Sequence, residues 1–279
     1  MYVGVNGTRL FFDVEGAKLV PDGPAMRERP TVVLLHGGPG FDHSTYRPSF
    51  GALADVAQLV YYDHRGQGRS DKSDPSHWNL AQWADDLRGL CDALGIERPI
   101  VFGNSFGGMV AMAYAARHPE HPAKLVFSST ATHQDLELVV ARFGELGGPE
   151  VADAARRFWE EPGGDTLGDY LRVAFPFYGR APRDPDANAR TVWALDVMFH
   201  FLGGEMRTMD LAPGLARVRC PTLLLAGDRD PVCPIEQALE IAAALPAEHV
   251  RFERFPDCGH GVFRDDPRGF EVLRDFIRE

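Results

Sequence analysis

The stretch Ile100–Met109 reads IVFGNSFGGM and contains the pattern G-x-S-x-G around Ser105. An apolar run precedes the pattern and a segment rich in glycine and alanine follows it, which predicts a strand, a sharp turn and a helix. Such a turn strains the serine backbone and projects the hydroxyl above the sheet, so it requires small neighbours. Small residues are present at Gly103, Gly107 and Gly108. We therefore predict that Ser105 is a nucleophile.

Short apolar runs alternate with helix-like segments on both sides of this stretch. The runs are Thr31–His36, Gln58–Asp63, Ile100–Asn104, Lys124–Ser128, Thr222–Gly227 and Val250–Phe255. The helix-like segments are Leu80–Leu94, Phe106–Arg117, Ile235–Leu245 and Pro267–Ile277. Because the runs lack period-two alternation, we expect strands that are covered on both faces. The order predicts an α/β fold with a mainly parallel sheet and helices on both sides.

Local patterns mark the ends of several elements. Asn6-Gly7, between two short apolar runs, predicts a β-hairpin at the N-terminus. Asn79, followed three residues later by Gln82, predicts a capping box at the start of a helix. Asp266 and Pro267 predict the N-cap and the first position of the last helix.

The segment from about His133 to Thr208 interrupts the alternation. It contains no strand-like run, and two helix-prone stretches, Leu136–Leu146 and Glu150–Glu160, are followed by breaks rich in proline and glycine. We predict a catalytic domain formed by residues 1–131 and 209–279, with a helical cap over residues 132–208 inserted between two strands.

A serine hydroxyl is a poor nucleophile near neutral pH, so it needs a base and a carboxylate that orients the base. Two later strands run into suitable residues, the first into Asp228 and Asp230 and the second into His260. Their order along the chain, serine, aspartate and histidine, is typical of α/β-hydrolases. Asp228 and Asp230 compete for the acid role, and we favour Asp230. We expect His260 to be the base.

A glycine-rich turn, His36–Gly40, directly follows the first predicted parallel strand. A tetrahedral intermediate needs two preorganised N–H donors for its oxyanion. We expect the amide of Phe106, the residue after the nucleophile, to be one donor and the amide of Gly38 to be the other.

Together these motifs resemble the α/β-hydrolase superfamily, and within it the proline-iminopeptidase-like branch. HGGPG at residues 36–40, DHRGQGRS at 63–70, the G-x-x-D-x-x-x-P pattern at 227–234 and Gly259-His260 carry the resemblance. It implies a mostly parallel, eight-stranded sheet with an inserted helical lid, and a serine hydrolase that uses no cofactor and no metal.

The substrate is less well specified, because the chain departs from the peptidase pattern. Pro231 follows Asp230 where aminopeptidases of this branch often place a carboxylate for the substrate ammonium, and Phe106 replaces a common Trp or Tyr. Other acids that could serve are Glu145, Glu160, Asp196 and Glu205. Asn104 resembles the elbow of carbon–carbon hydrolases that act on ring-fission products. We expect a small, partly apolar carboxylic ester or lactone as the substrate, with an amide as a variant of the same reaction. The alternative functions, in decreasing order of preference, are cleavage of prolyl peptides, cleavage of carbon–carbon bonds, and ligand binding without catalysis.

Aromatic residues of the predicted cap are candidates for the substrate pocket. We select Trp159, Trp193 and Phe199, although the cap is not enriched in aromatic residues relative to the rest of the chain.

Composition excludes several classes of partner. The 279 residues carry 40 acidic and 29 basic side chains, a net charge of −11, which disfavours nucleic acid and anionic membranes. The N-terminal residues lack the pattern of a signal peptide, and four scattered cysteines favour a reduced, cytoplasmic protein. We expect a monomer or homodimer that acts on a small molecule.

Overall fold

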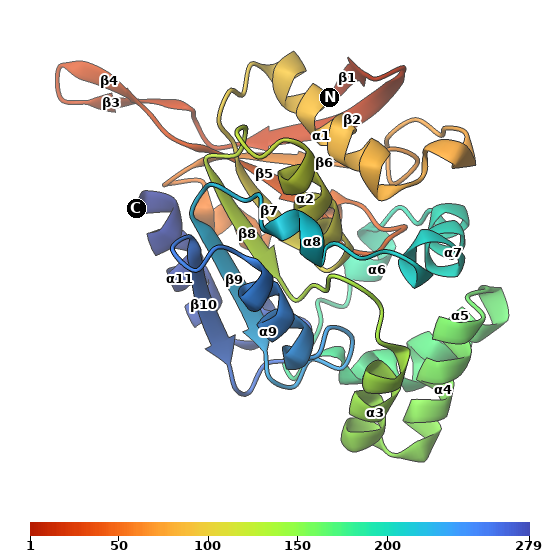
Figure 1. Cartoon of the computed structure of the whole chain (residues 1–279). Helices are drawn as coiled ribbons and strands as arrows, with labels where there is room; N and C mark the ends of the chain where they lie inside the picture. The colour runs from red at the N-terminus through yellow and green to blue at the C-terminus, as the bar shows by residue number, and fades with distance from the viewer.

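A single eight-stranded sheet forms the centre of the computed structural model, which describes residues 1–279 (Figure 1). The strand order is β1-β2-β6-β5-β7-β8-β9-β10. β1 pairs antiparallel with β2, and β2 pairs antiparallel with β6, whereas all later neighbours are parallel. The bounds are β1 Tyr2–Val5, β2 Thr8–Glu15, β5 Thr31–Leu35, β6 Gln58–Tyr62, β7 Ile100–Asn104, β8 Lys124–Ser128, β9 Thr222–Gly227 and β10 Val250–Phe255. The predicted fold class and the N-terminal hairpin are confirmed.

Burial follows the position of a strand in the sheet. Every residue of β5 and β9 is buried, as expected for strands covered on both faces. β10 differs because it is an edge strand, and only Phe255 in it is buried. The expectation of two covered faces is therefore wrong for β10, whose charged residues reach solvent.

Two apolar layers cover the two faces of the sheet. One layer contains Val33 and Leu35 with residues of α1 (Leu80–Leu94), α2 (Phe106–Arg117) and α9 (Ile235–Ala244). The other contains Val32 and Leu34 with residues of η2 (Ser49–Leu53) and α11 (Arg268–Arg278). Alternate residues of β5 thus belong to opposite layers, which is the period of a strand. None of the helices has the length and apolar character that a membrane crossing requires.

Two helix starts differ in detail from the sequence prediction. Asn79 Oδ1 accepts the N–H of Gln82 at 2.9 Å, but the Gln82 side chain donates to Asp86 instead of returning to Asn79. Only half of the predicted capping box therefore forms. The last helix begins one residue late, with Pro267 at its N-cap, while Asp266 still accepts the N–H of Arg268 at 2.9 Å.

Between β8 and β9 the chain forms only helices. They are α3 Leu136–Gly147, α4 Pro149–Glu160, α5 Gly164–Val173, η4 Phe175–Tyr178, α6 Ala187–Arg190, α7 Leu195–Gly203, η5 Glu205–Arg207 and α8 Ala212–Leu215. Figure 1 shows α3, α4 and α5 beyond the carboxyl ends of β8 and β9. This segment therefore lies at the edge of the sheet where the loops after the parallel strands gather.

A second, two-stranded sheet projects from the body of the protein (Figure 1). It consists of β3 (Leu19–Asp22) and β4 (Ala25–Glu28), and seven of their eight residues are exposed. The sequence analysis missed this hairpin because it has no buried face and hence no apolar periodicity.

Candidate active site

Ser105 occupies the sharp turn between β7 and α2. Its backbone has φ 55° and ψ −123°, a region that costs about 1–3 kcal/mol for a residue with a side chain. A Cβ at Gly103 or Gly107 would collide with backbone atoms, and one at Gly108 would lie 2.6 Å from Thr130. The structure confirms both the strain and the need for small neighbours.

Hydrogen bonds from the neighbouring strand hold this turn in place. The Ser105 N–H donates to the Ser128 carbonyl at 3.0 Å, and the Asn104 amide donates to the same carbonyl at 3.1 Å. Thr130 Oγ1 donates to the Ser105 carbonyl at 2.8 Å. β8 and the residues directly after it therefore hold the backbone of Ser105, and none of these bonds uses its hydroxyl.

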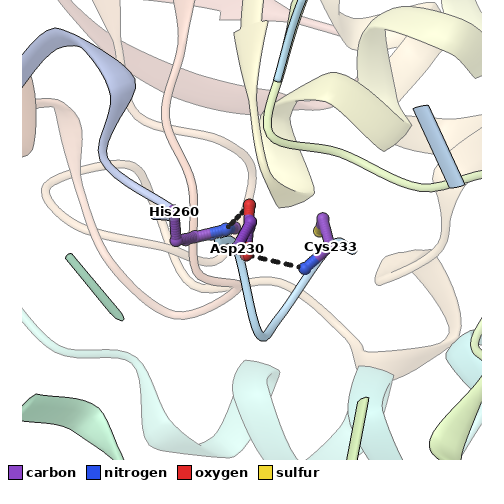
Figure 2. Close-up of side chains that lie close together, drawn as sticks. All are labelled: Asp230, Cys233 and His260. Carbon is purple, nitrogen blue, oxygen red and sulfur yellow. Dashed lines mark hydrogen bonds and ion pairs between the residues drawn. The ribbon is translucent and has the colours of Figure 1, made fainter. Parts of the chain in front are cut away.

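Asp230 and His260 come together because β9 and β10 are parallel neighbours in register. The register pairs Gly227 with Phe255, so the loops after the two strands start side by side. His260 Nδ1 lies 2.8 Å from Asp230 Oδ2 (Figure 2). A carboxylate only accepts, so we assign the ring proton to Nδ1.

Backbone donors hold the other oxygen of the Asp230 carboxylate. Oδ1 accepts the N–H groups of Val232 and Cys233 at 2.8 and 2.9 Å, and Asp230 is 1% exposed. Asp228 does not take part, because it pairs with Arg254 at 3.0 Å near the surface. The geometry thus distinguishes the two aspartates that compete in the sequence.

Asp230, Cys233 and His260 also form a cluster with ligand atoms within 4.8 Å of one another, which raises the question of a metal site (Figure 2). Both oxygens of the carboxylate already accept hydrogen bonds. Burial, together with the charge of Asp230, raises the pKa of the Cys233 thiol well above its usual value. Metal ligation requires a thiolate and free lone pairs. The donor set therefore suits an acid–base pair better than a metal.

Ser105 and His260 line one cavity of about 500 Å³. Asp230 does not line this cavity itself, but it is hydrogen-bonded to His260, which does. Neither Ser105 Oγ nor His260 Nε2 forms a hydrogen bond with another protein group. Trp159 and Trp193, the two tryptophans predicted for the pocket, also line the cavity. Phe199 does not, which corrects the sequence prediction. α7 buries Val197, Met198, Phe201 and Leu202, whereas Phe199 lies on another side of that helix and is only partly buried.

The two predicted oxyanion donors border the same cavity. Gly38 has φ 121°, and no protein acceptor takes its N–H. Phe106 is the first residue of α2, so its N–H has no partner within the helix. Its ring packs against Trp83 and Phe201 at centroid distances of 5.0 and 5.1 Å, and the residue lines the cavity. Gln67 Oε1 accepts the Gly40 N–H at 2.6 Å and so links the 63–70 loop to this turn.

The acids considered for an ammonium group lie elsewhere. Glu145 pairs with Arg142, Glu160 with Arg156, and Asp196 with Lys72. Glu205 accepts the N–H of Leu80 at 2.8 Å. None of these four acids lines the cavity.

Tyr178 and Asp265 are two contacts of the histidine loop that the sequence analysis missed. The His260 N–H donates to the Tyr178 carbonyl at 2.6 Å, and the two rings meet edge-on at 5.3 Å. The buried carboxylate of Asp265 accepts N–H groups from Gly259 at 2.9 Å, Ala181 at 3.0 Å and Arg180 at 3.1 Å. Asp265 therefore joins the helical segment to the loop that carries His260. The sequence Asp265-Asp266-Pro267 predicted a structural role for an aspartate at this point. The sequence analysis assigned that role to Asp266, as an N-cap, and none to Asp265.

The four cysteines are all free and buried. Burial raises the pKa of Cys258, two residues before His260, to about 11. The thiol is therefore protonated near neutral pH and unreactive.

Comparisons with known proteins agree with this architecture. The family described as alpha/beta hydrolase fold matches residues 30–267. A putative carbamate hydrolase from Caulobacter vibrioides is 41% identical over 261 residues, covering 88% of this chain and 90% of the relative. A proline iminopeptidase from Levilactobacillus brevis is 28% identical over 264 residues, covering 86% of this chain and 85% of the relative. The crystal structure of a Mycobacterium smegmatis proline iminopeptidase superposes with a TM-score of 0.77 at 25% identity, covering 100% and 97% of the two chains.

The chain therefore belongs to the α/β-hydrolase family. Within it, the relatives place the chain in the proline-iminopeptidase-like branch, and the protein is a hydrolase. The relatives carry different activities in their names, so membership of the branch does not by itself define the substrate.

Proposed function

We propose that the protein is a serine hydrolase that cleaves a small, partly apolar carboxylic ester or lactone through an acyl-enzyme. The observation that carries the proposal is the hydrogen bond of 2.8 Å between Asp230 and His260, in a cavity that Ser105 also lines. A strained serine, a histidine with a free Nε2 and a carboxylate on its Nδ1 are the three parts that nucleophilic acyl transfer needs.

In the proposed reaction, Ser105 Oγ attacks the substrate carbonyl while His260 Nε2 takes the hydroxyl proton. Asp230 keeps the imidazole in the required tautomer and stabilises the imidazolium that forms. His260 then returns the proton to the leaving alcohol. Water, activated by the same histidine, attacks the acyl-enzyme and releases the acid.

The amides of Gly38 and Phe106 are the proposed oxyanion donors. Loss of one such donor typically costs about 3–4 kcal/mol of transition-state stabilisation. Both amides lack a competing acceptor in the protein, which leaves them available to the developing charge.

We further propose that residues 132–208 act as a cap on a catalytic domain formed by residues 1–131 and 209–279. In support, Trp159, Phe175, Tyr178 and Trp193 of this segment line the same cavity as Ser105. Their apolar surfaces favour a substrate with an apolar portion next to the scissile bond.

Prolyl aminopeptidase activity is the second candidate, because the Levilactobacillus and Mycobacterium relatives carry that name. An aminopeptidase must bind an ammonium, and a carboxylate is the natural partner. The cavity-lining acids are Asp135 and Asp184, and both are engaged, Asp135 by the N–H of Leu138 and Asp184 by Arg190. The lack of a free carboxylate favours the ester or lactone.

The test compares a short p-nitrophenyl ester with proline p-nitroanilide, using the wild type and Ser105→Ala. We expect ester turnover by the wild type, little or no anilide cleavage, and loss of nearly all ester turnover in Ser105→Ala with an unchanged circular dichroism spectrum. Faster cleavage of the anilide would favour the aminopeptidase. Undiminished ester turnover in Ser105→Ala would contradict the assignment of the nucleophile. No turnover by the folded wild type would point to a binding protein.

A further inference from the structure

The charged residues that line the cavity are mostly basic, although the protein as a whole carries a net charge of −11. They comprise four arginines and two aspartates: Arg47, Arg183, Arg190, Arg264, Asp135 and Asp184. The cavity lining therefore has an excess of positive charge, opposite in sign to the net charge of the whole protein, which suggests that these arginines have a role in the cavity.

Three of the arginines have carboxylate partners within the protein. Arg47 pairs with Asp13 and Glu15 at 2.7 and 3.1 Å, and Arg190 pairs with Asp184. Arg264 contacts Asp265 only through Nε, at 3.3 Å. That carboxylate also accepts three backbone N–H groups, so it compensates the guanidinium only in part.

Arg183 has no such partner. It makes no ion pair or hydrogen bond with another protein group, and its guanidinium lies over the ring of Phe175, 3.9 Å from the centroid. Partial burial of the guanidinium, together with the nearby charge of Arg264, lowers the pKa of Arg183. The side chain is exposed and also lines the cavity, so it lies at the cavity mouth.

The Arg264 guanidinium lies beside the loop that carries His260, and Arg183 is near enough to Arg264 for the two charges to interact. Arg264 follows His260 by four residues, and a Cβ at Gly261 would lie 2.8 Å from its Nη2. A Cβ at Gly179, in the segment that leads to Arg183, would collide with the same atom. Glycines on both sides thus make room for Arg264, and Arg183, stacked on Phe175, lines the same cavity.

We propose that Arg183, assisted by Arg264, binds a carboxylate of the substrate, so that the substrate is an anionic ester or lactone with its acid group at some distance from the scissile carbonyl. A guanidinium with free N–H donors binds a carboxylate through charge-assisted, often bidentate hydrogen bonds. This inference rests on the proposed ester or lactone hydrolysis and specifies its substrate class.

The test uses two esters that differ only at the far end of the acyl chain, monomethyl adipate and methyl hexanoate. In the wild type, we expect kcat/KM for monomethyl adipate to exceed that for methyl hexanoate by about tenfold at low salt. Arg183→Gln should reduce this ratio by about tenfold, mainly through KM, and Arg183→Lys should restore part of it. Added salt should also reduce the ratio, because the site is open to solvent.

Arg180→Gln is the matched control. Arg180 lies three residues away in the same segment, pairs with Asp257 at 3.0 Å, is exposed and does not line the cavity, so its loss should leave the ratio unchanged. Equal kcat/KM for the two esters in the wild type, or a ratio unaffected by Arg183→Gln, would overturn the inference while leaving ester hydrolysis intact. Failure to cleave either ester would instead count against the proposed function.

Discussion

The carboxyl edge of the sheet and the helical segment 132–208, which we propose as a cap, both line one cavity, yet they are held in different ways. Ser105, Asp230 and His260 follow their strands closely, and backbone hydrogen bonds and glycines define where they lie. The cap is held by packed aromatic rings, such as Phe158 against Tyr170 at 4.5 Å, and by exposed ion pairs.

From this difference we infer that the sheet edge determines the reaction and that the cap determines which substrate is bound. Positions that depend on backbone geometry admit few residue types, whereas packed side chains can be exchanged for others of similar volume. We therefore expect substitutions at the sheet edge to abolish turnover or folding, and substitutions in the cap to alter the choice of substrate.

Asp230→Asn provides the largest expected effect. The amide would favour the wrong tautomer of His260, and kcat should fall by about 10⁴-fold with the fold retained. Asp228→Asn is the control, because Asp228 pairs with Arg254 instead of the histidine, and it should change kcat less than twofold. Steady-state ester hydrolysis by the two variants measures both. Similar losses in both would show that the two aspartates are not distinguished as the structure indicates.

Replacing one glycine by alanine in each region tests whether backbone geometry constrains the sheet edge more than the cap. Gly107→Ala would drive a Cβ into the Leu35 carbonyl and should destabilise the protein by about 3 kcal/mol or more. Gly168→Ala, in the middle of α5 with no atom within 4 Å of the new Cβ, should stabilise it by about 0.5–1 kcal/mol. Thermal unfolding of both variants gives the comparison. A tolerated Gly107→Ala would show that the turn is less constrained than described.

Asp265 joins the two regions and makes their contact depend on pH. Burial alone raises the pKa of this carboxyl, but the N–H donors of Gly259, Ala181 and Arg180 outweigh it and hold the pKa below its usual value. The charged form therefore stabilises the fold above pH ~4, and the contribution is lost as pH falls through the lowered pKa.

Asp265→Asn should lack this part of the pH dependence and lose about 2–4 kcal/mol at pH 7, because one buried acceptor becomes a donor. Urea unfolding between pH 3 and pH 7 measures the free energy of unfolding of wild type and variant, and the two values should converge near pH 3. Asp257→Asn, at a carboxylate that is 79% exposed, is the control. Equal stability of wild type and Asp265→Asn at pH 7 would exclude this role.

The smallest effect is expected within the cap. Trp193 lines the cavity and packs edge-on against Phe41 at 4.8 Å, so Trp193→Leu should raise KM for longer acyl esters by about three- to tenfold with little change in kcat. Phe199→Leu, on the same segment but outside the cavity lining, should not change chain-length preference. Ester series from acetyl to hexanoyl would show whether the cap sets specificity in this way.

The same difference explains what sequence reasoning could predict. β5 and β9 are buried apolar runs, so the fold could be predicted from local patterns. Ser105, Asp230 and His260 could be proposed in the same way, because each lies in the segment that follows a strand. The β3–β4 hairpin has no buried face and left no pattern. Arg183 and Tyr178 reach the cavity only through the packing of the cap, which no local spacing encodes. Phe199 was misplaced for the same reason.

The most direct test of the central claim is covalent labelling with a fluorophosphonate, which phosphonylates an activated serine. We predict one phosphonyl group per chain, located on Ser105 by peptide mass spectrometry, with ester turnover lost in proportion to labelling and no labelling of Ser105→Ala. Full ester turnover in the labelled protein, or stoichiometric label on any other residue, would contradict the proposal that Ser105 is the nucleophile.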